Sequence, residues 1–112
     1  MNRGEIFFFD LEPTVGSETR KIRPCIVVHR DVREDRSPTT IVCPISDARD
    51  RPGDVLNPFI PAGIAGLGKN SRVICNQVRA LDKMRVTSEA LGRVPSAIMA
   101  EIERGLRAIL DL

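Results

Sequence analysis

Histidine, cysteine and aromatic residues are all scarce in this chain of 112 residues: it has one histidine, three cysteines and no tryptophan or tyrosine. No His, Cys and carboxylate side chains recur at the spacing of metal ligands, so we expect neither a hydrolytic metal site nor a cofactor. No glycine-rich loop is followed by Lys and Ser or Thr, which excludes a phosphate loop of the nucleotide-hydrolase type. His29 alone cannot supply the usual acid and base pair, and its place after the apolar run IVV predicts a structural role.

Long hydrophobic runs are also missing. The longest uncharged stretch, residues 55–68, is interrupted by two prolines and three glycines and is shorter than the ~20 apolar residues of a membrane-spanning helix. The apolar run near the N-terminus stops at Asp10 and is too short for the core of a signal peptide. We therefore expect no export signal and no membrane association.

The three cysteines are far apart, and each lies in an apolar, strand-like run. The spacing of Cys25, Cys43 and Cys75 supports neither a CxxC redox pair nor a zinc site, so we expect buried free thiols. Free thiols are typical of the reducing cytosol, which predicts a cytoplasmic protein. With 42% hydrophobic and 29% charged residues, the chain is expected to fold as a single domain over residues 1–112.

Short strands separated by turn signals account for most of the chain. The β-branched and aromatic segments predict five strands, over residues 5–11, 23–30, 39–46, 55–60 and 72–80. Pro44 lacks a backbone donor and should lie at an edge, a bulge or a strand end, which would turn Ser46 out of the ladder. On a continuous strand over residues 72–80, Gln77 and Arg79 share one face.

Helical signals occur only towards the C-terminus. A short helical turn is expected over residues 87–91, with Gly92 placed to end it. A longer amphipathic helix begins at Ser96, which can cap it. Its apolar face is formed by residues at three- and four-residue spacing, namely Ile98, Ile102, Leu106, Ile109 and Leu110. Five short strands and one terminal helix predict a mostly β fold, a compact SH3-like barrel.

The segment PTVGSETRKIRP, residues 13–24, is the most informative part of the chain. Gly16 and Ser17 favour a sharp turn whose polar side chains face one cavity. Pro24 biases Arg23 towards extended geometry, so the guanidinium projects from a stiff base. A rigid arginine beside Glu18 is a chemical match for a phosphodiester.

Cleavage of RNA by its own 2′-hydroxyl needs a base, an acid and donors aimed at the charge that grows on phosphorus. Arg23 can supply the donors, or it can form a structural ion pair with Glu18 or Asp10. Glu18 can act as the base or can orient Arg23. Ser46 can donate its hydroxyl to the phosphate if strand three ends beside strand two, or it can be a simple strand-end cap.

Basic residues are concentrated in one later segment. Between residues 69 and 85 a single acid, Asp82, is outnumbered by Lys69, Arg72, Arg79, Lys83 and Arg85. Such a segment can attract a polyanion or can be a solvated strand face. Since Trp and Tyr are absent, base recognition would rest on Phe59, another Phe or Arg planes, and on hydrogen bonds from Asn76, Gln77 and Arg79.

Three blocks in order, RGEIFFFDLEPTVGSETRKIRP, RSPTTIVCPIS and NQVRALDKMRV, resemble the MazF/PemK/Kid family of toxin ribonucleases over nearly the whole chain. The resemblance implies a homodimeric SH3-like barrel of the CcdB/MazF type with a C-terminal helix. It implies an mRNA interferase, a metal-independent endoribonuclease that cleaves single-stranded RNA at short sequences and is silenced by a cognate MazE-like antitoxin. Attack by the 2′-hydroxyl would leave a 2′,3′-cyclic phosphate.

The resemblance also assigns residues. The catalytic arginine of the family falls on Arg23 and its strand-end Thr or Ser on Ser46, while Glu18 corresponds to a carboxylate at the same site. This chain has Ser where many relatives have Thr, so the hydroxyl is kept and the stiffening β-branch is lost. The first loop has no histidine, so a histidine mechanism is not carried over. Residues expected to bind RNA are Ser17, Arg20, Lys21, Gln77, Arg79 and Lys83.

Two alternatives stay open at this point. A CcdB-like toxin of the same barrel type would bind a protein such as DNA gyrase through its C-terminal helix and would need no catalytic arginine. Here the helix ends in ILDL, and nothing in it indicates a dedicated binding tip. An inactive barrel that only binds the antitoxin is the third possibility.

Overall fold

A computed structural model of the chain describes residues 1–18, 21–31 and 36–112. The described residues are mostly β, with one long helix at the C-terminal end. The strands are β1 (Glu5–Asp10), β2 (Ile22–Val27), β3 (Thr39–Asp47), β4 (Phe59–Ile60), β5 (Ser71–Val73), β6 (Arg79–Asp82) and β7 (Gly92–Arg93). The helices are the 3-10 turns η1 (Cys75–Gln77) and η2 (Lys83–Arg85) and the α-helix α1 (Ser96–Leu110). The predicted fold class is confirmed.

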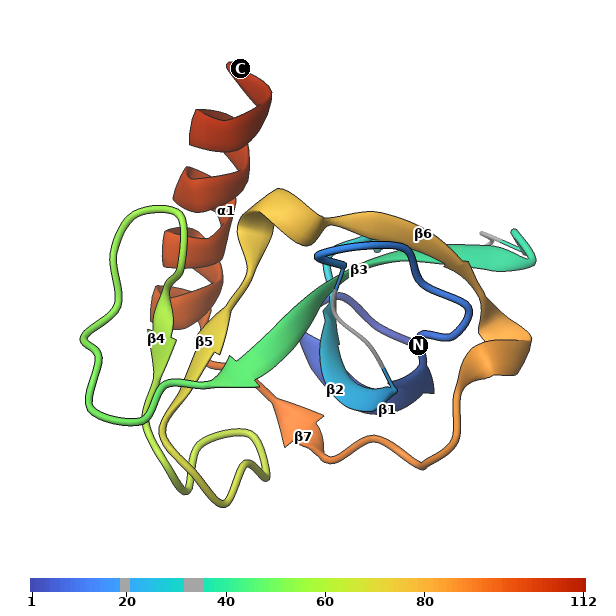
Figure 1. Cartoon of the computed structure of the whole chain (residues 1–112), viewed down its shortest axis with the longest axis horizontal. Helices are drawn as coiled ribbons and strands as arrows, with labels where there is room; N and C mark the ends of the chain where they lie inside the picture. Colours follow the sequence, from blue (N-terminus) through green and yellow to red (C-terminus); the bar gives the residue numbers. More distant parts are fainter. Residues whose placement is uncertain (19–20, 32–35) are drawn as a thin grey trace.

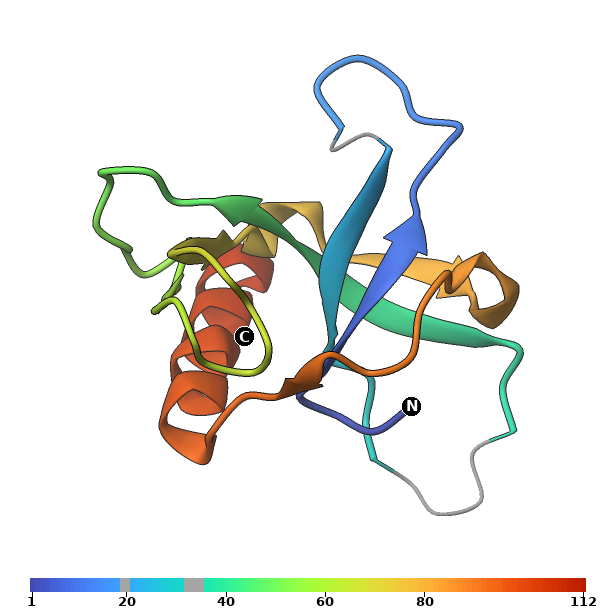
Figure 2. The same ribbon diagram turned by 90° about the horizontal axis from the view of Figure 1, so that it is seen from below.

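All strand pairs in the sheet are antiparallel, in the order β4-β5-β3-β2-β1-β7, and β6 also pairs with β3. The long central strand β3 pairs with β6 through its first residues and with β5 through its last three, while β2 lies along its other edge. Helix α1 lies against one face, behind β4 and β5 in Figure 1. Figure 2 shows the β1–β2 connection projecting from the opposite face.

Both faces of the sheet are buried, which explains the unbroken apolar run of β1. Successive residues of a strand point to opposite faces, so Ile6 belongs to one core cluster with Ile26 and Ile102 of α1. Phe7 and Phe9 belong to a second cluster on the other face, with their rings edge to face at 6.3 Å. A bridge between Phe9 and Val86 closes this second cluster by joining β1 to the chain after η2.

Pro44 lies where the pairing along one edge of β3 is interrupted, which suits a residue without a backbone N–H donor. The Pro44 carbonyl accepts from the Ile74 amide at 2.9 Å. Since the N–H and C=O of a strand residue point to the same side, the side of Pro44 without a donor faces the break between β5 and β6, where η1 replaces a strand. The expectation that this would turn Ser46 out of the ladder was wrong, because Ser46 pairs with Arg72 of β5.

The single strand predicted over residues 72–80 was also wrong. The chain forms β5, turns through η1, and then forms β6, with turn hydrogen bonds from Gln77 to Ile74 and from Val78 to Cys75. The register explains the turn: from Val73 opposite Ile45 to Arg79 opposite Val42 this chain advances six residues while β3 advances three, and η1 takes up the three extra residues. Gln77 and Arg79 therefore do not share the face of one strand.

Two smaller predictions need correction. Residues 55–58 precede β4 as a loop, so the fourth strand has two residues. No helical turn forms over residues 87–91, because this segment follows β1 instead. The Thr87 and Leu91 amides donate to the Phe8 and Ile6 carbonyls at 2.8 and 2.7 Å, and Gly92 begins β7 rather than ending a helix.

Helix α1 confirms the predicted amphipathic helix. Its N-cap residue is Pro95 and no side chain caps it, so Ser96 is its first residue and not its cap. Ile102 and Gly105 are buried against the sheet. A Cβ on Gly105 would lie 2.6 Å from the Val55 carbonyl oxygen and 2.9 Å from the Cys75 sulfur, so the helix packs closely there. No helix in the described part of the chain is both long and apolar enough to span a membrane.

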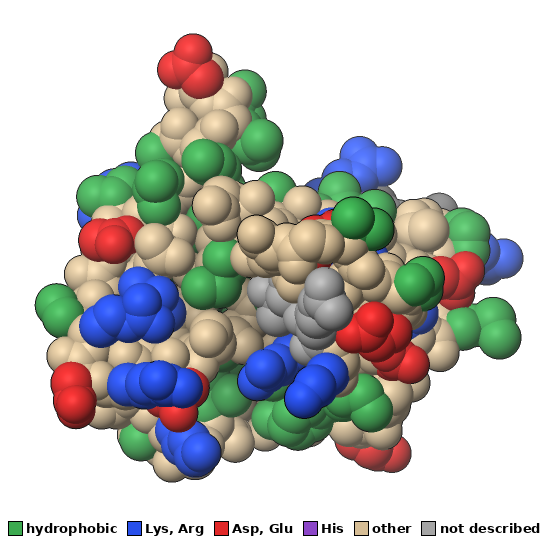
Figure 3. All heavy atoms as spheres, viewed as in Figure 1, with side chains coloured by type: hydrophobic (Ala, Val, Ile, Leu, Met, Phe, Trp, Pro, Cys, Tyr) green, Lys and Arg blue, Asp and Glu red, His purple; other side chains and the backbone are tan. Residues whose placement is uncertain are grey.

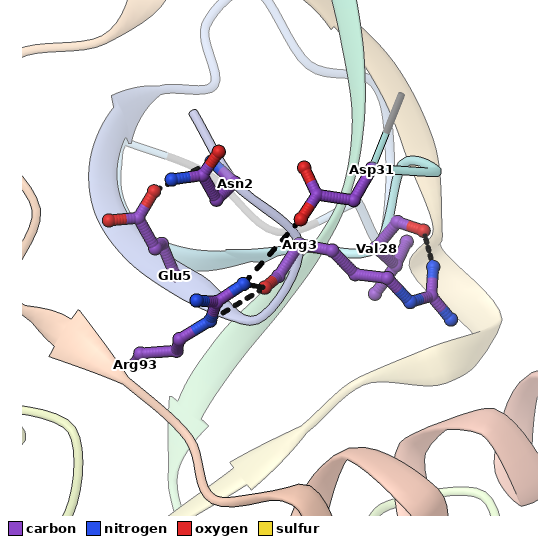
Figure 4. A network of polar contacts seen from close by, with 6 residues as sticks. All are labelled: Asn2, Arg3, Glu5, Val28, Asp31 and Arg93. Atoms are coloured by element: carbon purple, nitrogen blue, oxygen red, sulfur yellow. Dashed lines mark hydrogen bonds and ion pairs between the residues drawn. The ribbon is translucent and has the colours of Figure 1, made fainter. Parts of the chain in front are cut away.

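A polar network ties the N-terminus to β7 and to the chain after β2 (Figure 4), and an ion pair ties it to α1. Arg3 forms an ion pair with Glu103 at 2.7 Å and also donates to the Val28 carbonyl. Arg93 donates to the Arg3 carbonyl from Nε and Nη2 at 3.1 and 3.0 Å and lies 3.6 Å from the Asp31 carboxylate. These arginines therefore hold backbone and acidic partners in the fold.

Cys25, Cys43 and Cys75 are buried free thiols, as predicted. Burial raises the pKa of Cys25 from 9.0 to about 12, and the positive charge of Arg79 opposes this rise. Because the folded protein keeps this proton where the unfolded chain releases it, the free energy of unfolding should fall as the pH rises from 9.0 towards 12. Urea unfolding from about pH 8 to about pH 11 measures this fall.

The matched variant for this measurement is Cys25→Ala, which removes the thiol and introduces no larger group at this buried position. Its free energy of unfolding should decline less steeply with pH than that of the parent protein. Equal pH slopes for the two proteins would contradict the assignment.

Candidate functional site

Arg23 and Ser46 line the same cavity, which has a volume of about 420 Å³. It lies where β2 and β3 separate, beyond their last recorded pair, Cys25 with Pro44. Continuing this antiparallel register by two residues puts Arg23 opposite Ser46 on one face of the sheet. Its other walls come from β1, the ends of β2 and β3 and the loop before β5, namely Phe8, Pro24, Ile45, Asp47, Leu67, Gly68, Lys69 and Ser71.

Arg23 has the stiff base that its sequence context predicts. It lies within β2 and pairs with Phe9 of β1, whose side chain is fully buried. Arg23 itself is exposed, so its guanidinium is accessible to a ligand. The buried phenylalanine on one side and Pro24 on the other leave the backbone of Arg23 little freedom.

Ser46 is held from the opposite side of the cavity. It is half-buried in β3, and its cross-strand partner is Arg72 of β5. The expectation that strand three would end beside strand two needs one change: beyond Pro44, β3 pairs with β5. This pairing holds Ser46 at the edge of the gap while β2 diverges from it.

Glu18 lies in a second, smaller cavity of about 190 Å³ together with Gln77 and Arg79. Leu11 and Pro44 complete its described lining with Asn76 and Val78. The Glu18 carboxylate accepts a hydrogen bond from the Val15 amide at 2.6 Å, which fixes it within the β1–β2 connection. Pro44 is two residues before Ser46 and so on the same face of β3, which makes the two cavities neighbours on that face.

The other predicted RNA-binding residues have different positions. Ser17 and Lys21 are exposed in the β1–β2 connection, where the Lys21 amide donates to the Glu12 carboxylate at 3.0 Å. Arg20 lies outside the described residues. Lys83 is in η2, and its amide donates to the Pro38 carbonyl beside the first residue of β3. At ~3.3 Å per residue, this is roughly 20 Å along β3 from Ser46.

The basic segment over residues 69–85 does not form one surface. Lys69 lines the first cavity, 4.0 Å from Asp47, while Arg79 lines the second. Arg85 donates to the backbone carbonyls of Asp10 and Glu12, so it has a structural role. On the face that carries both cavities, basic side chains gather between the start of β2 and the loop after β3 (Figure 3).

Two features of the site were not predicted. The loop before β5 supplies Leu67, Gly68 and Lys69 to the wall of the first cavity, and Arg72 lies beside Ser46. A sequence does not show register, so neither position could be read from it. His29 follows β2 at the end away from Arg23, so it does not belong to this cavity.

Asp82 has a structural contact of its own: its carboxylate accepts from the Met84 amide at 2.8 Å and caps η2. Over residues 1–18, 21–31 and 36–112, no three His, Cys, Asp or Glu side chains are grouped so that they could hold a metal ion.

The sequence matches the family model of PemK-like, MazF-like toxins of type II toxin-antitoxin systems over residues 2–110. The chain belongs to this family. Its whole length is 33% identical to endoribonuclease MazF6 of Mycobacterium tuberculosis H37Rv, of which it covers 98%. It is 30% identical to endoribonuclease EndoA of Bacillus subtilis 168, again over its whole length and 96% of the relative. The resemblance that the three sequence blocks predicted is therefore confirmed.

Solved structures of PemK/MazF toxins share the fold. MazF of Deinococcus radiodurans superposes with a TM-score of 0.83 at 21% identity, covering all of this chain and 97% of that one. A mycobacterial endoribonuclease solved in complex with its cognate antitoxin superposes with a TM-score of 0.78 at 18% identity, covering all of this chain and 96% of that one. These likenesses support the predicted barrel with its C-terminal helix.

Proposed function

We propose that this PemK/MazF-family toxin is a sequence-specific endoribonuclease that cleaves single-stranded RNA without a metal ion. The observation that carries the proposal is the single cavity that Arg23 and Ser46 line from two diverging strands. A guanidinium and a hydroxyl that line one cavity supply hydrogen-bond donors of the kind that phosphodiester oxygens accept. Both relatives described above are named endoribonucleases.

In the proposed reaction the 2′-hydroxyl gives up its proton, and its oxygen attacks the adjacent phosphorus. The bond from phosphorus to the 5′-oxygen breaks, and that oxygen takes up a proton. The products are a 2′,3′-cyclic phosphate and a free 5′-hydroxyl. Arg23 stabilises the negative charge that grows on the phosphoryl oxygens, and Ser46 donates a further hydrogen bond to them.

Proton transfer falls to Glu18 or Arg23. The Glu18 carboxylate lies in the neighbouring cavity, and its Oε1 already accepts the Val15 amide. Its second oxygen is the one that would take a proton from substrate. Arg23 holds its proton strongly, so its main contribution is charge stabilisation.

The test is to incubate the purified protein with mixed-sequence RNA in EDTA and to sequence the 5′ ends of the fragments. We expect cleavage at one short sequence, free 5′-hydroxyl ends and 3′ ends that resist phosphatase until the cyclic phosphate is opened. RNA that stays intact at micromolar protein would refute the proposal. Cleavage that appears only after a divalent ion is added would refute its metal independence.

A cognate antitoxin of the MazE type and a second copy of the chain are the partners included in this proposal. The complex of a mycobacterial relative with its antitoxin supports the first. An acidic antitoxin tail should compete with RNA for the basic face of Figure 3. In a gel-shift titration the antitoxin should displace labelled RNA, and a ternary complex would contradict competition. Light scattering of the free toxin should give the mass of a dimer.

The CcdB-like alternative is not favoured. The named relatives are endoribonucleases, and an exposed arginine opposite a hydroxyl in one cavity has no role in a toxin that acts only through protein contacts. Growth inhibition by the Arg23→Ala variant separates the two functions, because a protein-binding toxin would keep its toxicity.

A further inference from the structure

A row of cross-strand partners continues from Ser46 away from Arg23. Ser46 in β3 pairs with Arg72 in β5, and Arg72 pairs with Phe59 in β4. Directly opposed residues of antiparallel strands share a face and lie within side-chain contact distance. By this register Ser46, Arg72 and Phe59 follow one another across β3, β5 and β4, and Arg23 of β2 lies on the other side of Ser46, across the cavity. Ser46 thus has an arginine residue on each side of it.

Arg72 lacks the partners that would explain it as a structural residue. It is half-buried, and its Nε atom is fully buried with no hydrogen-bond partner in the described part of the chain. No ion pair among the described residues includes it. Because Nε is enclosed by protein, an anion on the surface would be bound by the terminal Nη atoms, which form no ion pair among the described residues.

Asp54 is the carboxylate whose charge Arg72 does feel. The pKa of Asp54 is lowered, first by the hydrogen bond from the Asn57 side chain and only to a smaller extent by Arg72. The Asp54 carboxylate also accepts from the Leu56 and Asn57 amides at 3.0 and 2.9 Å, so its oxygens are used within its own loop. Asp54 therefore does not hold Arg72 in an ion pair.

We propose that Arg72 is a second phosphate-binding residue of the RNA site, which contacts a phosphodiester next to the one that is cleaved. This inference rests on the proposed function and deepens it. Arg23 and Arg72 are two strands apart, and because β2 diverges from β3 here their backbones are separated by more than the ~10 Å of two regular strand spacings. Both side chains are long and can extend towards Ser46. RNA bound along this row has the cleaved phosphate between Arg23 and Ser46 and an adjoining phosphate at Arg72. This contact positions the strand and takes no part in proton transfer.

The experiment uses short RNAs that contain the mapped cleavage sequence. In each RNA one linkage beside the cleaved bond is made neutral, as a 2′-O-methyl methylphosphonate, and the matched control has a 2′-O-methyl phosphodiester there. Scanning both sides, the parent protein should lose about tenfold in kcat/KM at one position, mainly through KM. The kcat/KM of Arg72→Ala should be about tenfold lower than that of the parent protein on the control RNA. Making the sensitive linkage neutral should not lower the kcat/KM of this variant further, since both changes remove the same contact.

Salt dependence gives a second readout. The slope of log affinity against log salt should be shallower by ~0.7 for Arg72→Ala, the value for one phosphate contact on a single strand. Arg72→Lys keeps the charge and should recover most of this slope. The control Arg107→Ala removes an exposed charge from the last turn of α1. It should change neither the salt dependence of RNA affinity nor the loss of kcat/KM at the neutralised linkage.

The outcomes separate the inference from the proposed function. If the parent protein cleaves RNA and Arg72→Ala has the same kcat/KM, the same response to each neutralised linkage and the same salt dependence, the inference is wrong while the proposed function stands. If the parent protein does not cleave at all, the proposed function fails first. If Arg72→Ala unfolds, the comparison is made on Arg72→Gln, which keeps the aliphatic stem and a polar end and removes the charge.

Discussion

Replacing Arg23 with alanine is expected to reduce RNA cleavage by about 10³-fold while leaving the fold intact. Removal of one preorganised donor from the charge of a transition state costs ~10²–10³ in kcat, and Arg23 supplies a charged, forked donor. The loss should appear in kcat more than in KM, because Arg72, Lys69 and the remaining basic face still bind the RNA. Initial cleavage rates on a fluorescent RNA with the mapped sequence measure it.

The controls follow from the position of Arg23. Since its side chain is exposed, the melting temperature of Arg23→Ala should lie close to that of the parent protein. Arg23→Lys keeps the charge but loses the planar, forked guanidinium, so its cleavage rate should lie between those of the parent protein and Arg23→Ala. Arg30→Ala removes an exposed arginine beyond the other end of β2 and should cleave normally. If Arg23→Ala retained a rate within threefold of the parent protein, Arg23 would not be catalytic.

Replacing Gly66 with alanine should have the largest effect on stability. Gly66 has φ of +77°, where an alanine costs ~1–2 kcal/mol, and its Cβ would lie 2.3 Å from the Leu91 carbonyl oxygen. The clash is with backbone, so the loop must move away from the segment before β7, at a further ~1–3 kcal/mol. We expect the free energy of unfolding to fall by about 3 kcal/mol in all, which lowers the melting temperature by more than ~10 °C.

Two other glycines of the same loop separate the causes. Gly63 also has a positive φ, +89°, but open space around it, so Gly63→Ala reports backbone strain alone. Gly68 has neither feature, so Gly68→Ala should be close to neutral. Thermal melts of the three variants should rank Gly66→Ala lowest and Gly68→Ala highest. Equal effects at Gly63 and Gly66 would show that the contact with Leu91 contributes nothing.

Gly66 also matters for the site. It precedes Leu67, Gly68 and Lys69, which form one wall of the cavity of Arg23 and Ser46. Displacing the loop should therefore lower cleavage beyond the loss that unfolding explains, when activity is measured well below the melting temperature.

Much of the fold could be predicted because it depends on local signals. The β-branched and aromatic runs produced β1, β2 and β3, and the apolar periodicity after Pro95 produced α1. Predictions failed where the chain responds to distant partners. The run over residues 72–80 reads as one strand, yet its pairing with β3 shifts register by three residues between β5 and β6, and the extra residues form η1. Residues 87–91 lack a helix because their amides bind carbonyls of β1.

The candidate site divides in the same way. Arg23 owes its stiff, extended backbone to Pro24, and the three ordered blocks indicated the family, because both depend on residues that are adjacent in the sequence. That Ser46 stands across a cavity from Arg23, that Glu18 lies in a neighbouring one, and that Arg72 flanks Ser46 was decided only by the tertiary structure. Strand register and divergence arise from packing on both faces of the sheet, and no local pattern of residues records them.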